Sequence, residues 1–275
     1  MEGISMNGKK VKSFDNTEIY YMKDVPQNAK AIIIIVHGVA EHLGRYEYLK
    51  DKFESFGYGV YRFDNRGHGL SEGNRGDMND FNELIDDTDI IVNIAKKEYP
   101  DLPLYMLGHS MGGFITAAYG VKYKNKLRGQ ILSGAATNKM PFSLTLKSIK
   151  FPYILKGKVP NSLSKLISRD PQVVKKYEED PLVLKETTLR FNNQFVNKGI
   201  PWLVRNLSSY EYPCLILHGG DDHIVPKECS QKFYDGISSK DKQIKIYEGL
   251  YHEIFNEKER DTVIEDVHKW LENRL

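Results

Sequence analysis

The chain has 275 residues, of which 40% are hydrophobic and 28% charged, and its 39 basic and 37 acidic side chains leave a net charge of +2. This length can bury one sizeable core, either as a single α/β domain or as a domain with an insertion. Basic and acidic residues are interspersed along the chain, which excludes the clustered positive surface that nucleic-acid binding requires.

The chain contains two cysteines, Cys214 and Cys229, and neither lies in a spacing typical of a metal site. Two cysteines cannot form a disulfide framework, so we expect reduced thiols in a cytoplasmic protein. Residues 1–11 are polar and basic, without the apolar run of a signal peptide. The longest aliphatic run, residues 31–36, is far too short to span a membrane, and we expect a soluble protein.

The first third of the chain alternates between predicted strands and helices. Residues 11–24 alternate loosely around a polar centre, which predicts an antiparallel hairpin at one edge of a sheet. Residues 31–36 are continuous and mostly β-branched, as expected for a parallel strand buried on both faces. A helical pattern follows over 46–56, then a strand over 58–63 and a second helix from about Asp80. This order predicts a parallel sheet covered by helices.

The same alternation continues, stops, and then resumes. The predicted elements are strands at 104–107, 129–133, 214–218 and 243–247, and helices at 111–123, from Pro226 and from Arg260. Residues 137–205 lack the alternation and contain no convincing buried strand, only short helical patterns at 173–178 and 182–195. We interpret 137–205 as an inserted helical cap on a core formed by residues 1–136 and 206–275.

A G-x-S-x-G pattern, Gly108-His109-Ser110-Met111-Gly112, lies where one of these strands meets its helix. A sharp strand-to-helix turn at this point would hold Ser110 in a strained conformation with its hydroxyl exposed, as a nucleophile requires. A backbone that folds back so tightly leaves no room for a Cβ on either side of the serine, which explains Gly108 and Gly112.

A serine nucleophile needs a base to take its proton and an acid to orient that base. Asp221 and Asp222 follow the next-to-last predicted strand, and His252 follows the last. Loops at the carboxyl ends of parallel strands share one edge of the sheet, so we expect these residues to meet Ser110. The residue pattern alone does not choose between the two aspartates, and an Asp pair beside glycine is also typical of a solvated turn.

Other histidines and acids have a simpler interpretation. Four histidines adjoin glycines at predicted strand ends and are expected to brace loops: His37, His68, His109 and His218. A metal site at His218, Asp221, Asp222 and His223 is not expected, because all four lie in one tight turn without a distant ligand pair. We expect neither a metal nor another cofactor.

An oxyanion formed during attack would need two backbone N–H donors. Met111, the residue after the nucleophile, supplies the first. Val39, in the loop after the buried strand at 31–36, is the expected second donor. Each such donor is typically worth about 3 kcal/mol of the reaction barrier.

Several motifs together resemble a known family. They are His37-Gly38-Val39-Ala40-Glu41-His42 with Arg45-Tyr46, Asp64 with Arg66-Gly67-His68-Gly69 and Ser71, Gly108-His109-Ser110-Met111-Gly112-Gly113, the loops at Asp222 and His252-Glu253, and the cap fragment Ser168-Arg169-Asp170-Pro171 followed by Tyr177 and Asp180-Pro181-Leu182. In these motifs the chain resembles the monoacylglycerol lipase and lysophospholipase branch of the α/β-hydrolases over nearly its whole length. It departs from the family at Val39 and Ala40, where Ala and Gly are common.

The resemblance implies a mostly parallel eight-stranded sheet with helices on both faces and an inserted helical cap. It implies hydrolysis of a carboxylic ester of an acyl lipid, a monoacylglycerol or a lysophospholipid, through an acyl-enzyme on Ser110. By its position two residues before Ile224, Asp222 rather than Asp221 is implied as the acid. The extra methyl groups of Val39 and Ala40 are expected to narrow the mouth of the acyl site.

Two alternative functions stay open. One keeps the triad but acts on thioesters, short soluble esters or peptides, and the other is an inactive scaffold used for binding, although no triad member is missing.

Residues 140–160 alternate apolar side chains with lysines, a pattern that fits either peripheral contact with an anionic membrane or ordinary packing on the core. The sequence does not indicate an oligomeric state.

Overall fold

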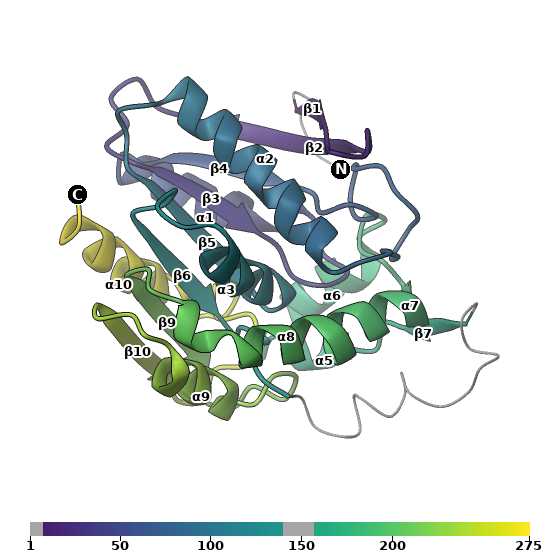
Figure 1. Ribbon diagram of the computed structural model, residues 1–275. Helices are drawn as coiled ribbons and strands as arrows, with labels where there is room; N and C mark the ends of the chain where they lie inside the picture. Colours follow the sequence, from purple (N-terminus) through teal and green to yellow (C-terminus); the bar gives the residue numbers. More distant parts are fainter. Residues whose placement is uncertain (1–7, 140–156) are drawn as a thin grey trace.

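The computed structural model describes residues 8–139 and 157–275 (Figure 1). Its centre is an eight-stranded sheet with the order β1-β2-β4-β3-β5-β6-β9-β10. The strands are β1 (Lys9–Lys12), β2 (Glu18–Asp24), β3 (Ile32–Val36), β4 (Gly59–Phe63), β5 (Leu104–His109), β6 (Gly129–Ser133), β9 (Cys214–Gly219) and β10 (Lys242–Tyr247). Only the pairs β1–β2 and β2–β4 are antiparallel. The expected mostly parallel eight-stranded sheet is confirmed.

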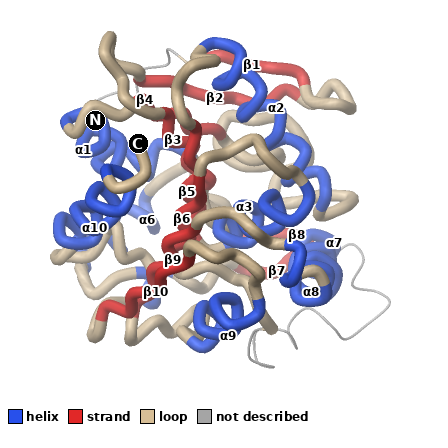
Figure 2. The backbone as a smooth tube through the Cα atoms, turned by 60° about the vertical axis from the view of Figure 1, so that its left-hand side comes forward, coloured by secondary structure: helices blue, strands red, loops and turns tan. Residues whose placement is uncertain are grey.

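Helices cover both faces of this sheet (Figure 2). The helices α1 (Glu47–Ser55) and α10 (Arg260–Glu272) pack on one face, and α2 (Asn82–Glu98), α3 (Met111–Lys122) and α9 (Glu228–Gly236) pack on the other. Strand β3 contributes to both layers, because Ile33 and Ile35 face the first and Ile32 and Ile34 face the second. This two-sided burial explains why its sequence is continuously aliphatic.

Between β6 and β9 the described residues contain no strand of the large sheet. They form α5 (Ser164–Ile167), α6 (Pro171–Glu179), α7 (Leu189–Asn192), the π-helical segment Asn193–Gly199, α8 (Ile200–Arg205), the short helix Leu207–Ser209, and a two-stranded antiparallel sheet of β7 (Lys158–Pro160) and β8 (Glu186–Thr188). Of the segment 140–160 considered above, residues 140–156 lie outside the described residues. Among the described residues no helix is both long and apolar enough to cross a bilayer.

The predicted helical pattern over 182–195 was wrong in its first half. Strand β8 occupies Glu186–Thr188, and the helix begins only at Leu189, where the Thr188 hydroxyl accepts the N–H of Phe191 at 3.0 Å. The N–H groups of Leu184 and Thr188 donate instead to the carbonyls of Ala40 and Gly76, at 2.9 and 2.8 Å. Hydrogen bonds to distant loops therefore replace the local helical ones.

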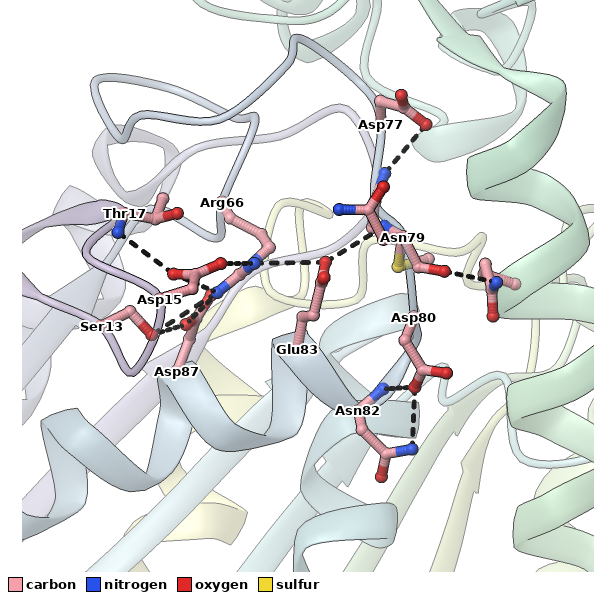
Figure 3. A network of polar contacts seen from close by, with 12 residues as sticks. Ser13, Asp15, Thr17, Arg66, Asp77, Asn79, Asp80, Asn82, Glu83 and Asp87 are labelled. Atoms are coloured by element: carbon pink, nitrogen blue, oxygen red, sulfur yellow. Dashed lines mark hydrogen bonds and ion pairs between the residues drawn. The ribbon is translucent and has the colours of Figure 1, made fainter.

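A buried polar network ties the N-terminal hairpin to the loop after β4 (Figure 3). The Arg66 guanidinium donates to both carboxylate oxygens of Asp87 in α2, at 2.6 and 2.7 Å, and to Asp15 in the hairpin at 2.9 Å. Glu83 lies 3.2 Å from the same guanidinium. Further along this loop, Asp77 forms an ion pair with Arg190 of α7.

Arg66→Met is expected to lower the free energy of unfolding by about 3–5 kcal/mol, because it leaves the fully buried Asp87 without its cation. Urea unfolding followed by circular dichroism measures the change. Lys10→Met is the matched control, since it also removes one cation, but from the exposed Lys10–Glu18 pair, and it is expected to leave the midpoint nearly unchanged. Equal midpoints for the two variants would contradict the assigned importance of Arg66.

Candidate active site

The G-x-S-x-G pattern forms a tight turn between β5 and α3. Ser110 has φ 56° and ψ −115°, a left-handed conformation that is unfavourable for a residue with a Cβ. Its N–H donates to the carbonyl of Ser133 in β6 at 2.9 Å, and its carbonyl accepts from Phe114 at 3.1 Å. The structure thus places Ser110 on the strained turn that the sequence predicts.

The glycines on either side of Ser110 are required by close backbone contacts. A Cβ on Gly108 would lie 2.2 Å from the carbonyl oxygen of Gly112, and a Cβ on Gly112 would lie 2.0 Å from the carbonyl oxygen of Val36. Both are far inside van der Waals contact with backbone atoms that cannot turn away. The end of β3, the end of β5 and the start of α3 therefore meet only because both positions are glycine.

Asp222 and His252 form a buried pair at the carboxyl edge of the sheet. The two are joined by a 2.6 Å contact between His252 Nδ1 and Asp222 Oδ2. Asp222 follows β9 and His252 follows β10, and these parallel neighbours end in register. The other oxygen of Asp222 accepts the N–H groups of Ile224 and Val225 at 2.8 and 2.9 Å. Asp221 is exposed, so the structure brings Asp222 and not Asp221 to the histidine.

Burial and pairing act on this couple in opposite directions. Burial lowers the pKa of His252, but the carboxylate of Asp222, followed by Glu253 and Glu41, outweighs it and leaves this pKa raised. Burial likewise raises the pKa of Asp222, and the charge and hydrogen bonds of His252 and His218 reverse this to a net lowering. Asp222 is therefore held ionised, and His252 is a stronger base than a free imidazole.

Ser110 and His252 line one small cavity together with Gly38, Val39 and His109. Its volume of about 10 Å³ is roughly that of a single water molecule. Ser110 and His252 thus face a common space.

Of the two expected oxyanion donors, Val39 lines this cavity, and Met111 directly follows Ser110 in the chain. Among the described residues, neither the N–H of Val39 nor that of Met111 has a hydrogen-bond acceptor. The loop carrying Val39 passes directly over the nucleophile, since a Cβ on Gly38 would lie 3.2 Å from Ser110 Cβ. Both N–H groups therefore lack an acceptor in the described part of the chain, which leaves them free to serve as the expected donors to an oxyanion.

A buried ion pair joins the Val39 loop to the His252 loop. Nη2 of Arg45 lies 2.8 and 2.6 Å from the two carboxylate oxygens of Glu253. Glu41, 3.8 Å from the same guanidinium, accepts the N–H of Gly38 at 2.9 Å and the hydroxyl of Tyr46 at 2.6 Å. The N–H donor loop and the base are thereby held at a set separation.

The histidine before the nucleophile is neutral. The rings of His109 and His252 have centroids 4.6 Å apart, and His109 Nδ1 lies 3.3 Å from Ser133 Oγ. Burial and the charge of His252 lower the pKa of His109 to about 3. His109 therefore packs against the base without competing with it for a proton.

Sequence reasoning missed a role for His218 beyond bracing its loop. Nε2 of His218 lies 3.1 Å from Asp222 Oδ2, the same oxygen that contacts His252. Its position in the sequence could have indicated this role, because His218 lies at the end of the predicted strand at 214–218, four residues before Asp222. Among the described residues no group of three or more His, Cys, Asp or Glu side chains is arranged to hold a metal ion.

A second cavity, of about 130 Å³, also borders Ser110. Val39 and Ala40 line it from the donor loop, and Leu163, Phe195 and Val196 line it from the segment between β6 and β9. Ala40 has φ 65°, so this departure from the family's common glycine places a methyl group at a strained, cavity-lining position. The mostly apolar lining suits a hydrocarbon chain attached to a carbonyl at Ser110.

Comparison with known proteins finds one hydrolase family and several lipid-hydrolysing relatives. Residues 27–259 match the family model described as serine aminopeptidase, S33. The chain is 34% identical to a monoacylglycerol lipase of Mycolicibacterium smegmatis over 90% of this chain and 89% of that protein, and 33% identical to a phospholipase of Bacillus subtilis over 85% and 92%. The crystal structure of a monoacylglycerol lipase of Paleococcus ferrophilus superposes with a TM-score of 0.83 at 30% identity, covering 94% of this chain and all of that one.

Asp222→Asn is expected to reduce turnover of an ester substrate by about four powers of ten, because His252 would lose the carboxylate that orients it and stabilises its charged form. Asp221→Asn is the matched control on the neighbouring exposed aspartate and should stay within a few-fold of the wild type. Steady-state kinetics on a chromogenic ester measures both. A larger loss in the Asp221 variant would reverse the assignment.

The pH dependence follows from the raised pKa of His252. The base must be neutral to accept the serine proton, so kcat/KM rises as the pH passes upward through this pKa. The acid limb of the kcat/KM profile is therefore expected above about 6.5, the value of an unperturbed imidazole. A midpoint at or below that value would show that Asp222 does not outweigh burial.

Proposed function

We propose that Ser110, His252 and Asp222 form a catalytic triad. The premise is that the chain belongs to the serine aminopeptidase S33 family of α/β-hydrolases. The chain is a carboxylic ester hydrolase of acyl lipids. The observation that carries the residue assignment is the single cavity shared by Ser110 and His252, with Asp222 2.6 Å behind the base.

In the proposed first half-reaction, Ser110 Oγ attacks the ester carbonyl carbon while His252 Nε2 takes the hydroxyl proton. The carbonyl oxygen becomes an anion and accepts the N–H groups of Val39 and Met111. His252 then gives its proton to the leaving alcohol oxygen as the ester C–O bond breaks, and the acyl group stays on Ser110.

In the second half-reaction, water replaces the alcohol. His252 takes a proton from the water as its oxygen attacks the acyl-enzyme, and the same two N–H groups hold the second oxyanion. The proton returns to Ser110 Oγ as the fatty acid leaves. Throughout, Asp222 keeps the proton of His252 on Nδ1 and stabilises the imidazolium that forms in each step.

We propose a monoacylglycerol or a lysophospholipid as the substrate. Relatives that carry the names monoacylglycerol lipase and phospholipase cover most of this chain, and the apolar cavity beside Ser110 supports an acyl chain as the part of the substrate that it binds. In this proposal residues 137–205 form a cap over a core of residues 1–136 and 206–275, and the lining residues Leu163, Phe195 and Val196 support that division.

We place the protein in the cytoplasm as part of the same proposal. Cys214 and Cys229 are both free thiols, and unpaired cysteines suit a reducing compartment. Peripheral membrane contact by the cap stays a prediction, since residues 140–156 lie outside the described residues. Co-sedimentation with anionic liposomes tests that contact.

Peptide hydrolysis is the second candidate, because the description of the matched family names an aminopeptidase. The same triad can cleave either bond. Parallel assays with monoacylglycerols, lysophospholipids and aminoacyl p-nitroanilides separate the two, and turnover of the anilides alone would favour the peptidase.

A fluorophosphonate probe is expected to label the wild-type protein and to leave Ser110→Ala unlabelled, because only an activated serine reacts with it. Labelling followed by gel fluorescence and mass spectrometry of the modified peptide identifies the residue. Failure of the folded wild type to label would favour an inactive scaffold.

Esters of p-nitrophenol with rising acyl length are expected to give kcat/KM values that increase beyond butyrate, because each CH₂ group placed in the apolar cavity contributes up to about 0.8 kcal/mol. The series acetate to palmitate measures this dependence. Activity confined to acetate and butyrate would replace the lipase assignment with that of a short-chain esterase.

A further inference from the structure

The acid of the site is held by more donors than its role in orienting His252 requires. Two backbone N–H groups, of Ile224 and Val225, occupy Asp222 Oδ1. Oδ2 receives His252 Nδ1 at 2.6 Å and also lies 3.1 Å from Nε2 of His218. The side chain of Asp222 is fully buried, so these contacts take the place of water around both carboxylate oxygens.

The contacts of His218 determine where its proton lies. Nε2 is 2.8 Å from the carbonyl oxygen of Val225, which can only accept, so Nε2 carries a hydrogen. Nδ1 is 2.7 Å from the hydroxyl of Ser230 in α9 and can accept that hydroxyl's hydrogen. The Nε2–H therefore donates to the Val225 carbonyl, and Asp222 Oδ2 lies beside this N–H group, 3.1 Å from the same nitrogen. The side chain of His218 is fully buried, and this arrangement leaves neither of its nitrogens unpaired.

We propose that His218 is a positioning residue that acts through Asp222, its Nε2–H holding the carboxylate oxygen that His252 uses and thereby limiting how strongly this oxygen attracts the proton of His252. The inference rests on the triad proposed above and adds a fourth side chain to it. His218 does not reach the cavity of Ser110 and touches no reacting atom.

The physical consequence concerns the basicity of His252. An N–H group beside Oδ2 places partial positive charge near the imidazolium form of His252 and draws electron density from the oxygen that His252 contacts. Both effects disfavour protonated His252. Loss of the donor is therefore expected to move the acid limb of kcat/KM toward higher pH, whereas loosening of Asp222 from His252 would move it toward lower pH.

The other titratable and charged groups around His252 are unchanged when His218 is replaced. His252 faces Asp222 after β9, His109 at the end of β5 and Glu41 in the loop that carries Val39, and Glu253 is its neighbour in the chain. Arg45 neutralises the two glutamates from behind. None of these groups contacts His218 among the described residues apart from Asp222, so a change at His218 reaches the base through that carboxylate.

His218→Phe tests the proposal by removing the donor while keeping a ring of similar size. We expect kcat to fall about tenfold, as is typical when the hydrogen-bond partner behind a metal-binding side chain is removed. KM should be nearly unchanged, and the acid limb of kcat/KM should move to higher pH. His218→Gln, whose amide N–H₂ can reach Asp222 from the same side, is expected to restore the position of the limb.

Ser230→Ala is the matched control. It removes the partner of Nδ1 and so weakens the bracing of His218 against α9, but it leaves the Nε2–H contact with Asp222. Its thermal midpoint is expected to fall while its pH profile matches the wild type. A His218→Phe profile that also matches the wild type, with only stability reduced, would overturn the proposal and leave His218 as a structural brace.

Failure of the His218 proposal can be distinguished from failure of the proposed triad. If the wild type does not react with the fluorophosphonate probe, the proposed function fails, and the positioning role of His218 that rests on it fails with it. If it does react, the double variant Asp222→Asn/His218→Phe decides. The His218 change should then add little to the loss caused by Asp222→Asn, because both act through one carboxylate, and full additivity would contradict the proposal.

Discussion

The turn at Ser110 exists because three backbone segments, the ends of β3 and β5 and the start of α3, approach more closely than any Cβ would allow. Gly108 and Gly112 permit this approach, with backbone oxygens at 2.2 and 2.0 Å from where their Cβ atoms would lie. The sheet supports the strained serine through the Ser133 carbonyl. The same turn makes Met111 the first residue of a helix, so its N–H has no intrahelical acceptor and can serve a substrate oxygen. One set of backbone contacts therefore produces both the position of the proposed nucleophile and one of its two proposed oxyanion donors.

Burial then requires the charged side chains around this turn to be paired. Removing charges from water is costly unless they are paired, and the site pairs them in two groups. Asp222 is ionised beside His252, and Arg45 lies between Glu253 and Glu41. The second group also connects the loop of Val39 to the loop of His252. The electrostatic pairing that makes burial tolerable thus also sets the distance between the donors and the base.

The segment between β6 and β9 is bound to those same loops rather than to the sheet. Leu184 donates its N–H to Ala40, next to the donor Val39, and Glu253, next to His252, donates its N–H to Ile167, both at 2.8–2.9 Å. His42 of the donor loop also pairs with Asp180 at 2.8 Å. Displacing this segment would therefore break hydrogen bonds to residues adjacent to the donor and the base.

The sequence by itself determined the buried strand at 31–36, the strained turn at Ser110 and the order serine, aspartate, histidine, because hydrophobic periodicity and glycine spacing are local properties and parallel strands share one edge. The pattern of residues left Asp221 and Asp222 equivalent, and only the family resemblance favoured Asp222. The tertiary structure decided that Asp222 faces His252, that His218 shares its oxygen, and that residues 182–188 form loop and strand instead of helix. Each of these outcomes depends on a hydrogen-bond partner brought close by packing, and periodicity along the chain carries no information about which side chain or carbonyl that partner will be.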